Sequence, residues 1–177
     1  MTDDLVVVAA RVGVVGDRLG AGGLSAFAPA LDSIFGDVAL PEAGRDQRAD
    51  AIDLMSGWRR TMLDHPWSAA ILGGRPLLGP NVLARTDFLY ATLATTGLAG
   101  ARLATAAYAV AIYVIGSALM QVGAQDGTSG AAEHLARSRD LYPALAEHGH
   151  LDDGDWDAAF VQGLDYLLDG IGAVTSR

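Results

Sequence analysis

The stretch that decides the fold is residues 100–124, GARLATAAYAVAIYVIGSALMQVGA, which carries no Asp, Glu, Lys, Arg or His between Arg102 and Asp126. A helix that is apolar on every side must be buried on every side, either in lipid or against other protein helices. Its length suffices to cross a bilayer, because roughly 20 apolar residues span one. No Lys/Arg cluster or Trp belt anchors its ends, however. We therefore expect the central helix of a soluble helical protein, with one face covered by a second copy of the chain.

Composition and charge limit the function classes that the chain fits. Its 177 residues suffice for one domain, and the hydrophobic content of 51% against 19% charged residues indicates an oligomeric interface. The net charge of −9 repels phosphate backbones, which makes the chain by itself a poor candidate for nucleic-acid binding. It has no cysteine and therefore no disulfide or thiolate metal site. The N-terminus lacks the basic region of a signal peptide, so we expect a cytoplasmic protein.

Helical periodicity runs through the rest of the chain, and no segment alternates as a half-buried strand does. In residues 45–64 the apolar positions Ile52, Met55 and Trp58 recur at helical spacing, with Asp50 and Arg59 mainly off that face. Asp153 can cap the last helix. We expect an all-α fold with loops at 36–44 and 123–130 and helices at 5–19, 24–35, 45–64, 66–72, 80–96, 100–124, 131–139, 142–147 and 153–174.

Two of these helices carry more apolar surface than one chain covers. The uncharged helix and the last one, taken from each of two copies, can form a four-helix bundle, and two-fold symmetry is the commonest closed arrangement. We place Leu164 and Leu168 of the last helix at this subunit contact. The sequence thus predicts a homodimer.

Several short motifs occur in an order that resembles a known family. They are HPW at 65–67, GGRPLLGPN at 73–81, TTG at 95–97, GSALMQ at 116–121, YPALAEHG at 142–149 and DAAFVQGLDYLLDGI at 157–171. Together they resemble the effector-binding, dimerising domain of TetR-type transcriptional regulators, in the branch typified by the tetracycline repressor. The resemblance covers about residues 31–174. It implies a helical bundle with the TetR-type effector-domain topology, which dimerises through four helices.

The resemblance divides the chain into two parts. Residues 36–177 correspond to the ligand-binding and dimerisation domain, and residues 1–35 to a truncated or degenerate helix-turn-helix remnant plus a connecting helix. Residues 8–19 resemble the turn region of that motif, but the GAGGLSAFAPA that follows offers no Tyr, His or Lys, and only Arg11 and Arg18 are available for phosphates. We expect operator DNA as a partner only if an intact helix-turn-helix exists.

The family also implies a cavity in each subunit for a small apolar or aromatic effector, whose binding changes the distance between two DNA-binding heads. The magnesium–tetracycline chemistry does not carry over. Where the tetracycline repressor has a histidine and a threonine, this chain has Ile71 and Gly74. Magnesium needs oxygen ligands, which neither side chain supplies. We expect no metal site and no cofactor.

Large residues on the helices that should surround the cavity are the candidate ligand contacts. Met and aromatic side chains line adaptable apolar pockets, and Asn81, Thr105 and Tyr108 could orient a ligand through hydrogen bonds. Each candidate could equally be ordinary core, or a polar group satisfied by backbone or water. The candidate set is Trp58, Met62, Trp67, Ile71, Asn81, Phe88, Thr105, Tyr108 and Ile112.

The sequence shows no catalytic motif: it has no G-x-S-x-G, no P-loop and no G-x-G-x-x-G after a strand. His65, which precedes Pro66, fits a helix cap better than a catalytic base, and EHGH at 147–150 lacks a third anchored metal ligand. We expect a ligand-responsive transcriptional regulator, specifically a repressor, rather than an enzyme. A helical small-molecule-binding protein without DNA-binding activity is the alternative, and a membrane helix hairpin comes third.

Overall fold

Every regular element in the described part of the computed structural model is an α-helix. The structure describes residues 28–42, 46–72, 78–127, 131–148 and 155–175. The helices are α3 (Ala28–Gly36), α4 (Gln47–Asp64), α5 (Pro66–Leu72), α6 (Pro80–Ala94), α7 (Gly100–Gly127), α8 (Ala131–Arg137), α9 (Pro143–His148) and α10 (Trp156–Thr175). The all-α prediction is confirmed, whereas the expected helix at 5–19 and the start of the one at 24–35 lie outside the described residues.

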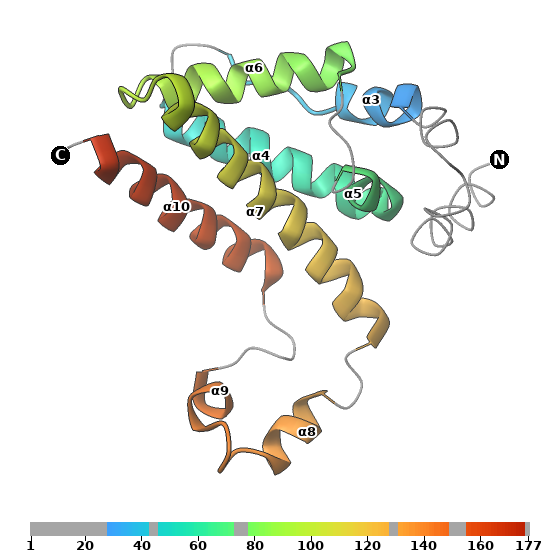
Figure 1. The fold of residues 1–177 in the computed structure, drawn as a ribbon. Helices are drawn as coiled ribbons and strands as arrows, with labels where there is room; N and C mark the ends of the chain where they lie inside the picture. The colour runs from blue at the N-terminus through green and yellow to red at the C-terminus, as the bar shows by residue number, and fades with distance from the viewer. Residues whose placement is uncertain (1–27, 43–45, 73–77, 128–130, 149–154, 176–177) are drawn as a thin grey trace.

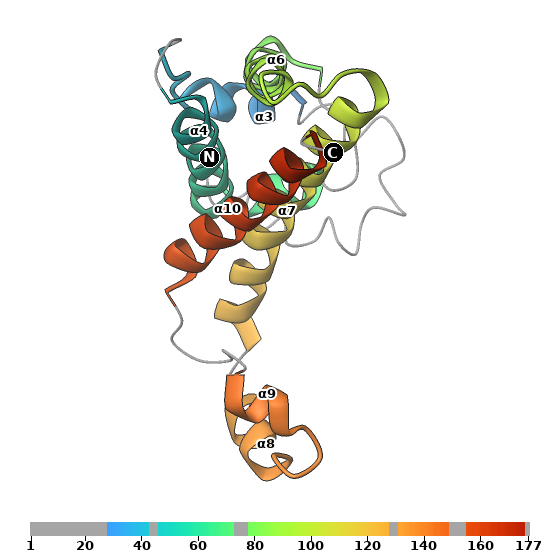
Figure 2. The same ribbon diagram turned by 90° about the vertical axis from the view of Figure 1, so that its left-hand side faces the viewer.

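The long helix α7 is the central element, as its uncharged sequence predicted. It packs against α4, α5, α6 and α10, and α3 packs against α6 and α4 (Figure 1). Figure 2 shows α7 and α10 side by side, with α8 and α9 beyond the C-terminal end of α7 and away from the other helices. The body of the molecule is therefore α3 to α7 together with α10.

One face of α7 is buried in the chain and the other is not. The buried face is made of small residues, which let the neighbouring helices approach closely: Ala106, Ala107, Val110, Val114 and Ala118. The opposite face exposes large apolar side chains: Tyr108, Ile112, Leu119 and Met120. In the described part of the chain, Gly100–Ala124 is also the one helix that is long and apolar enough to cross a membrane, with a mean hydropathy of 1.8.

The helix boundaries follow from local chemistry. Asp46 caps α4, because its carboxylate accepts hydrogen bonds from the backbone N–H groups of Arg48 (3.0 Å) and Ala49 (3.5 Å). His65 is the C-cap of the same helix, as expected. Beyond α6 the chain turns at Gly97, whose φ of 91° is a conformation that favours glycine.

Two boundaries differ from the expectation. α7 continues to Gly127, through residues that were expected to form a loop, because extending an existing helix costs much less than starting one. α10 begins at Trp156 and is capped by Asp155 rather than Asp153. The Asp155 carboxylate accepts hydrogen bonds from the N–H groups of Asp157 (3.1 Å) and Ala158 (2.9 Å).

The placement of Leu164 and Leu168 at a subunit contact was wrong. These side chains are 0% and 9% exposed and belong to the hydrophobic core of their own chain. Phe160, Leu164 and Leu168 recur every four residues and form the inner face of α10, whereas Tyr166 lies off that face and is 65% exposed. Periodicity identified the apolar face of α10 but assigned it to the wrong neighbour.

Candidate functional site

The nine residues predicted to contact a ligand separate into three groups. One group is buried in the hydrophobic core: Trp58, Met62 and Ile71. A second group is partly buried, with Trp67 and Phe88 packed against that core: Trp67, Asn81 and Phe88. The third group lies on the exposed face of α7: Thr105, Tyr108 and Ile112. The structure therefore brings the first group into one core and leaves the third outside it.

Two buried polar atoms of this core have no hydrogen-bond partner within the described residues. They are the indole N–H nitrogen of Trp58 on α4 and the hydroxyl oxygen of Ser68 on α5, in residues that are 6% and 0% exposed. The indole ring of Trp58 packs against Phe35 of α3, with ring centroids 5.0 Å apart. Because buried N–H and O–H groups are nearly always paired in proteins, such atoms call for a specific explanation.

The buried carboxylate of Asp32 joins α3 to the start of α6. Its Oδ1 accepts from the backbone N–H of Val82 at 2.9 Å, and its Oδ2 accepts from the backbone and side-chain N–H groups of Asn81 at 3.3 and 3.1 Å. A negative charge at a helix N-terminus is stabilised by the unpaired N–H groups there. The backbone of Gly79 passes so close to Asp32 that a Cβ there would lie 2.2 Å from its Cγ. Asp32 thus caps α6 from another helix.

The buried guanidinium of Arg85 makes the reverse connection, from α6 to the end of α3. Its Nε donates to the carbonyl of Val38 at 2.8 Å, and its Nη2 donates to the carbonyl of Gly36 at 2.7 Å. Its Nη1 donates to the carbonyl of Asn81 at 3.0 Å, within its own helix. Asp32 and Arg85 together hold both ends of the α3–α6 contact, which we call the α3–α6 clamp.

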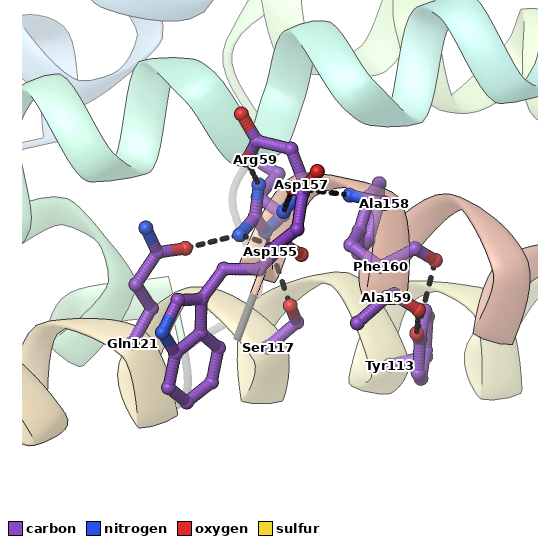
Figure 3. Close-up of polar contacts among 10 residues, drawn as sticks. Arg59, Tyr113, Ser117, Gln121, Asp155, Asp157, Ala158, Ala159 and Phe160 are labelled. Carbon is purple, nitrogen blue, oxygen red and sulfur yellow. Dashed lines mark hydrogen bonds and ion pairs between the residues drawn. The ribbon is translucent and has the colours of Figure 1, made fainter. Parts of the chain in front are cut away.

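A second buried cation, Arg59 of α4, reaches both α7 and α10 (Figure 3). The residue is 3% exposed. Its Nε donates to Ser117 Oγ at 3.1 Å, its Nη1 to Asp157 Oδ1 at 2.5 Å and its Nη2 to Gln121 Oε1. One carboxylate and neutral oxygens therefore replace the water around the charge, and Arg59 fixes the start of α10 against the rest of the bundle.

An aromatic pair continues this contact between α7 and α10. The Arg59 guanidinium lies 4.9 Å from the ring centre of Phe160, whose ring stacks on that of Tyr113 with centroids 5.5 Å apart. The Tyr113 hydroxyl donates to the carbonyl of Phe160 at 3.0 Å (Figure 3). Burial raises the pKa of Tyr113, and the positive charge of Arg59 offsets part of that rise.

An open groove of about 660 Å³ lies between α4, the end of α6 and the last turns of α10. Arg48 lines it and binds Asp165 (2.7 Å) and Asp169 (2.5 Å) of α10, and hydrogen bonds to both carboxylates raise the pKa of Arg48. These pairs are partly exposed, and screening by solvent limits their contribution to stability. None of the nine predicted residues lines this groove. Within the described ranges, no three His, Asp or Glu side chains lie close enough to share a metal ion.

Comparison with known proteins identifies the bundle. The model of the family described as tetracyclin repressor-like, C-terminal domain matches residues 40–175. The chain belongs to this family. Its members are transcriptional regulators rather than enzymes, which agrees with the absence of a catalytic motif from the sequence.

Individual relatives of this tetracyclin repressor-like domain support the same family assignment. An HTH-type transcriptional regulator of Saccharopolyspora erythraea is 47% identical over an alignment of 150 residues. The alignment covers 81% of this chain but only 64% of the relative, less than two thirds of its length. A solved structure of a possible TetR family transcriptional regulator from Streptomyces coelicolor is 29% identical, with a TM-score of 0.70, over 85% of this chain and 77% of that one.

Two further solved structures contain ligands. A variant of TetR from Acinetobacter baumannii AYE in complex with minocycline is 28% identical, with a TM-score of 0.58, over 87% of this chain and 70% of that one. The Streptomyces coelicolor TetR family protein ActR in complex with actinorhodin has a TM-score of 0.72 over 100% of this chain and 99% of that one. At 22% identity, this last likeness shows the fold alone.

Sequence reasoning about this tetracyclin repressor-like domain missed its buried charges. Asp50 and Arg59 were placed off the apolar face of their helix, yet both are buried, as are Asp32 and Arg85. The available signal was spacing: Arg85 falls three residues after Val82 and four before Leu89, within the apolar stripe of its helix. A charged residue at such a core position indicates a buried, partnered ion.

Proposed function

We propose that this chain is the effector-binding and dimerisation part of a ligand-responsive transcriptional repressor of the TetR type, acting in the cytoplasm. The family match over residues 40–175 carries the proposal. Such a regulator converts the binding of a small molecule into a movement of its DNA-binding segments. We further propose that residues 36–177 are the ligand-binding and dimerisation domain, and that residues 1–35 are the remnant of a DNA-binding head with its connecting helix.

The proposed effector is a small apolar or aromatic molecule that enters the core between α4, α5 and α7. The buried and partly buried candidates supply aromatic and thioether surface of the kind that lines adaptable pockets. One structural neighbour, the TetR variant that is 28% identical to this chain, was solved in complex with a small molecule, minocycline, which supports a small-molecule site in this fold. The exposed candidates Thr105, Tyr108 and Ile112 could contribute to such a site only if another surface covers them.

The covering surface that we propose is a second copy of the chain. Thr105, Tyr108, Ile112 and Leu119 follow one another at spacings of three, four and seven residues and form an exposed line, here called the α7 stripe. This spacing is the one by which helices pack side by side in four-helix bundles. Tyr166 adds a large exposed side chain on α10, which packs beside α7. A homodimer would remove the α7 stripe and Tyr166 from water.

A charge on the α7 stripe tests the dimer. Ile112→Arg places an unpaired cation in the proposed interface, so we expect the variant to sediment as a monomer with an intact helical circular dichroism spectrum. Leu78→Arg is the matched control, because Leu78 is 76% exposed and lies off α7. A dimeric Ile112→Arg variant would place the interface elsewhere.

The α3–α6 clamp is the proposed route from effector to DNA. α3 follows directly on residues 1–27, and Phe35 of α3 contacts the indole of Trp58 in the proposed effector site. A ligand that moves Trp58 would therefore act on a helix whose other contacts are fixed through Asp32 and Arg85. Since buried interfaces switch between discrete packings, a small shift at this point can reorient what precedes α3.

The composition of residues 1–27 favours one alternative, a ligand-binding protein without DNA-binding activity. Residues 1–27 carry two arginines against three aspartates. Selection from a random double-stranded DNA library with the full chain separates the two functions. The repressor proposal predicts enrichment of an inverted-repeat site whose binding weakens steeply with salt. If no sequence is enriched while small-molecule binding persists, the alternative is correct.

A further inference from the structure

The unpaired donors Trp58 and Ser68 carry an inference about the chemistry of the effector. We propose that the effector is an uncharged, flat molecule whose acceptor oxygens take the N–H of Trp58 and the O–H of Ser68. This inference rests on the proposed function, since it assumes that the core between α4, α5 and α7 opens to a ligand. It adds two specificity-determining residues and excludes ionised groups from this end of the ligand.

The burial of the two donors is the first step. Trp58 is 6% exposed and Ser68 0%, and neither the indole nitrogen nor the hydroxyl has a partner in the part of the chain that the structure describes. A serine on a helix can satisfy its hydroxyl through a nearby backbone carbonyl, and an indole can turn toward solvent, but neither occurs here. Leaving such groups unpaired in a core disfavours the folded state. A sequence that keeps both therefore fits a core that receives acceptors from outside the chain.

The surroundings determine the kind of acceptor. Ser68 is followed on α5 by Ala69 and Ile71, and Trp58 lies one turn from Met62 on α4, so the neighbouring core side chains are apolar. The adjacent cation, Arg59, has its N–H groups committed to oxygens of α7 and α10. A ligand charge would have no counter-ion among these residues, and burying it unpaired is costly. A carbonyl oxygen accepts from both donors without a charge.

The shape of the ligand follows from the aromatic contact. The rings of Trp58 and Phe35 lie 5.0 Å apart at 47°, which presents ring faces and edges from two different helices. Flat molecules gain most from such surfaces, because aromatic rings favour offset stacking and edge-to-face contacts. α4 and α5 pack against each other and against α7, so donors on both helices can face one ligand.

A matched pair of probes tests the inference. Anthraquinone and anthracene have the same three-ring outline, but only anthraquinone has carbonyl oxygens. We expect the full chain to bind anthraquinone about a hundredfold more tightly than anthracene in equilibrium dialysis, because two additional net hydrogen bonds give about tenfold each. Trp58→Phe and Ser68→Ala should each reduce anthraquinone affinity about tenfold and leave anthracene affinity unchanged. Trp156→Phe and Ser33→Ala, which alter exposed residues, are the controls and should change neither affinity.

The melting temperature of the ligand-free protein gives an independent result. Removing a hydroxyl that has no partner is neutral or stabilising, so we expect Ser68→Ala to leave the melting temperature unchanged or to raise it. A fall would mean that the hydroxyl is already paired, by water for example, and would overturn the inference. Equal affinity for anthraquinone and anthracene would overturn the inference as well, and so would variants that lose affinity equally for both probes. Either result would leave the proposed function intact. If neither probe binds, the inference and the effector site of the proposed function both fail.

Discussion

The α3–α6 clamp makes a quantitative prediction for Arg85→Met, which removes the guanidinium and keeps much of the side-chain volume. Two of its acceptors, the carbonyls of Gly36 and Val38, lie outside its own helix at 2.7 and 2.8 Å. A hydrogen bond to a charged group contributes about 1.5–3 kcal/mol, so two give about 3–6 kcal/mol. Removing the cation also removes its desolvation cost, which leaves a net loss of about 2–4 kcal/mol.

The assay is urea unfolding followed by circular dichroism at one fixed protein concentration, since the stability of a dimer depends on concentration. For a chain of this length, a loss of about 2–4 kcal/mol in the free energy of unfolding corresponds to a fall in melting temperature of roughly 4–16 °C. Arg60→Met is the matched control, because Arg60 is the exposed neighbour of Arg59 on α4, and surface changes stay within about 0.5 kcal/mol. A loss for Arg85→Met no larger than that of the control would refute the clamp.

Three further predictions concern close packing and pH. Gly79→Ala puts a Cβ 2.2 Å from the Asp32 carboxyl carbon and should lower the free energy of unfolding in urea by about 1–3 kcal/mol. An unchanged urea midpoint would show that Asp32 does not hold this position. Gly163→Ala puts a Cβ 2.1 Å from the Tyr113 hydroxyl oxygen, so Tyr113→Phe should recover part of its loss in a double-mutant cycle, whereas simple additivity would argue against the contact. Because the pKa of Tyr113 is raised above its usual value of 10, the stability it contributes is present below pH 10 and is lost as the pH rises through the folded-state pKa. Melting curves of the Tyr113→Phe variant should therefore show a smaller alkaline loss than those of the wild type, and identical losses would contradict the prediction.

Local signals in the sequence predicted the elements of the fold well. The absence of charge from residues 103–125 identified α7, and Pro66 marked the start of α5. These features act within one or two turns of the chain, where capping groups and proline determine the boundary. The order of short motifs then indicated the family, which the match over residues 40–175 confirmed.

The long-range contacts could not be predicted in the same way. Asp32 and Val82 are 50 residues apart, and periodicity shows which face of a helix is apolar but not which element covers it. The same ambiguity explains the placement of Leu164 at a subunit contact, although it faces its own chain. On α7 the inward face itself could not be predicted, because a helix that is apolar all round gives no sign of which face turns inward. The nine ligand residues, chosen partly on that helix, remain a prediction.

The mass of the chain in solution tests the central claim most directly, namely that the exposed α7 stripe is covered by a second copy. Sedimentation equilibrium in detergent-free buffer measures that mass without reference to a ligand or an operator. We predict a single species of twice the 18.3 kDa chain mass at micromolar concentration. A stable monomer, or a protein that stays in solution only with detergent, would contradict the dimer and with it the proposed regulator.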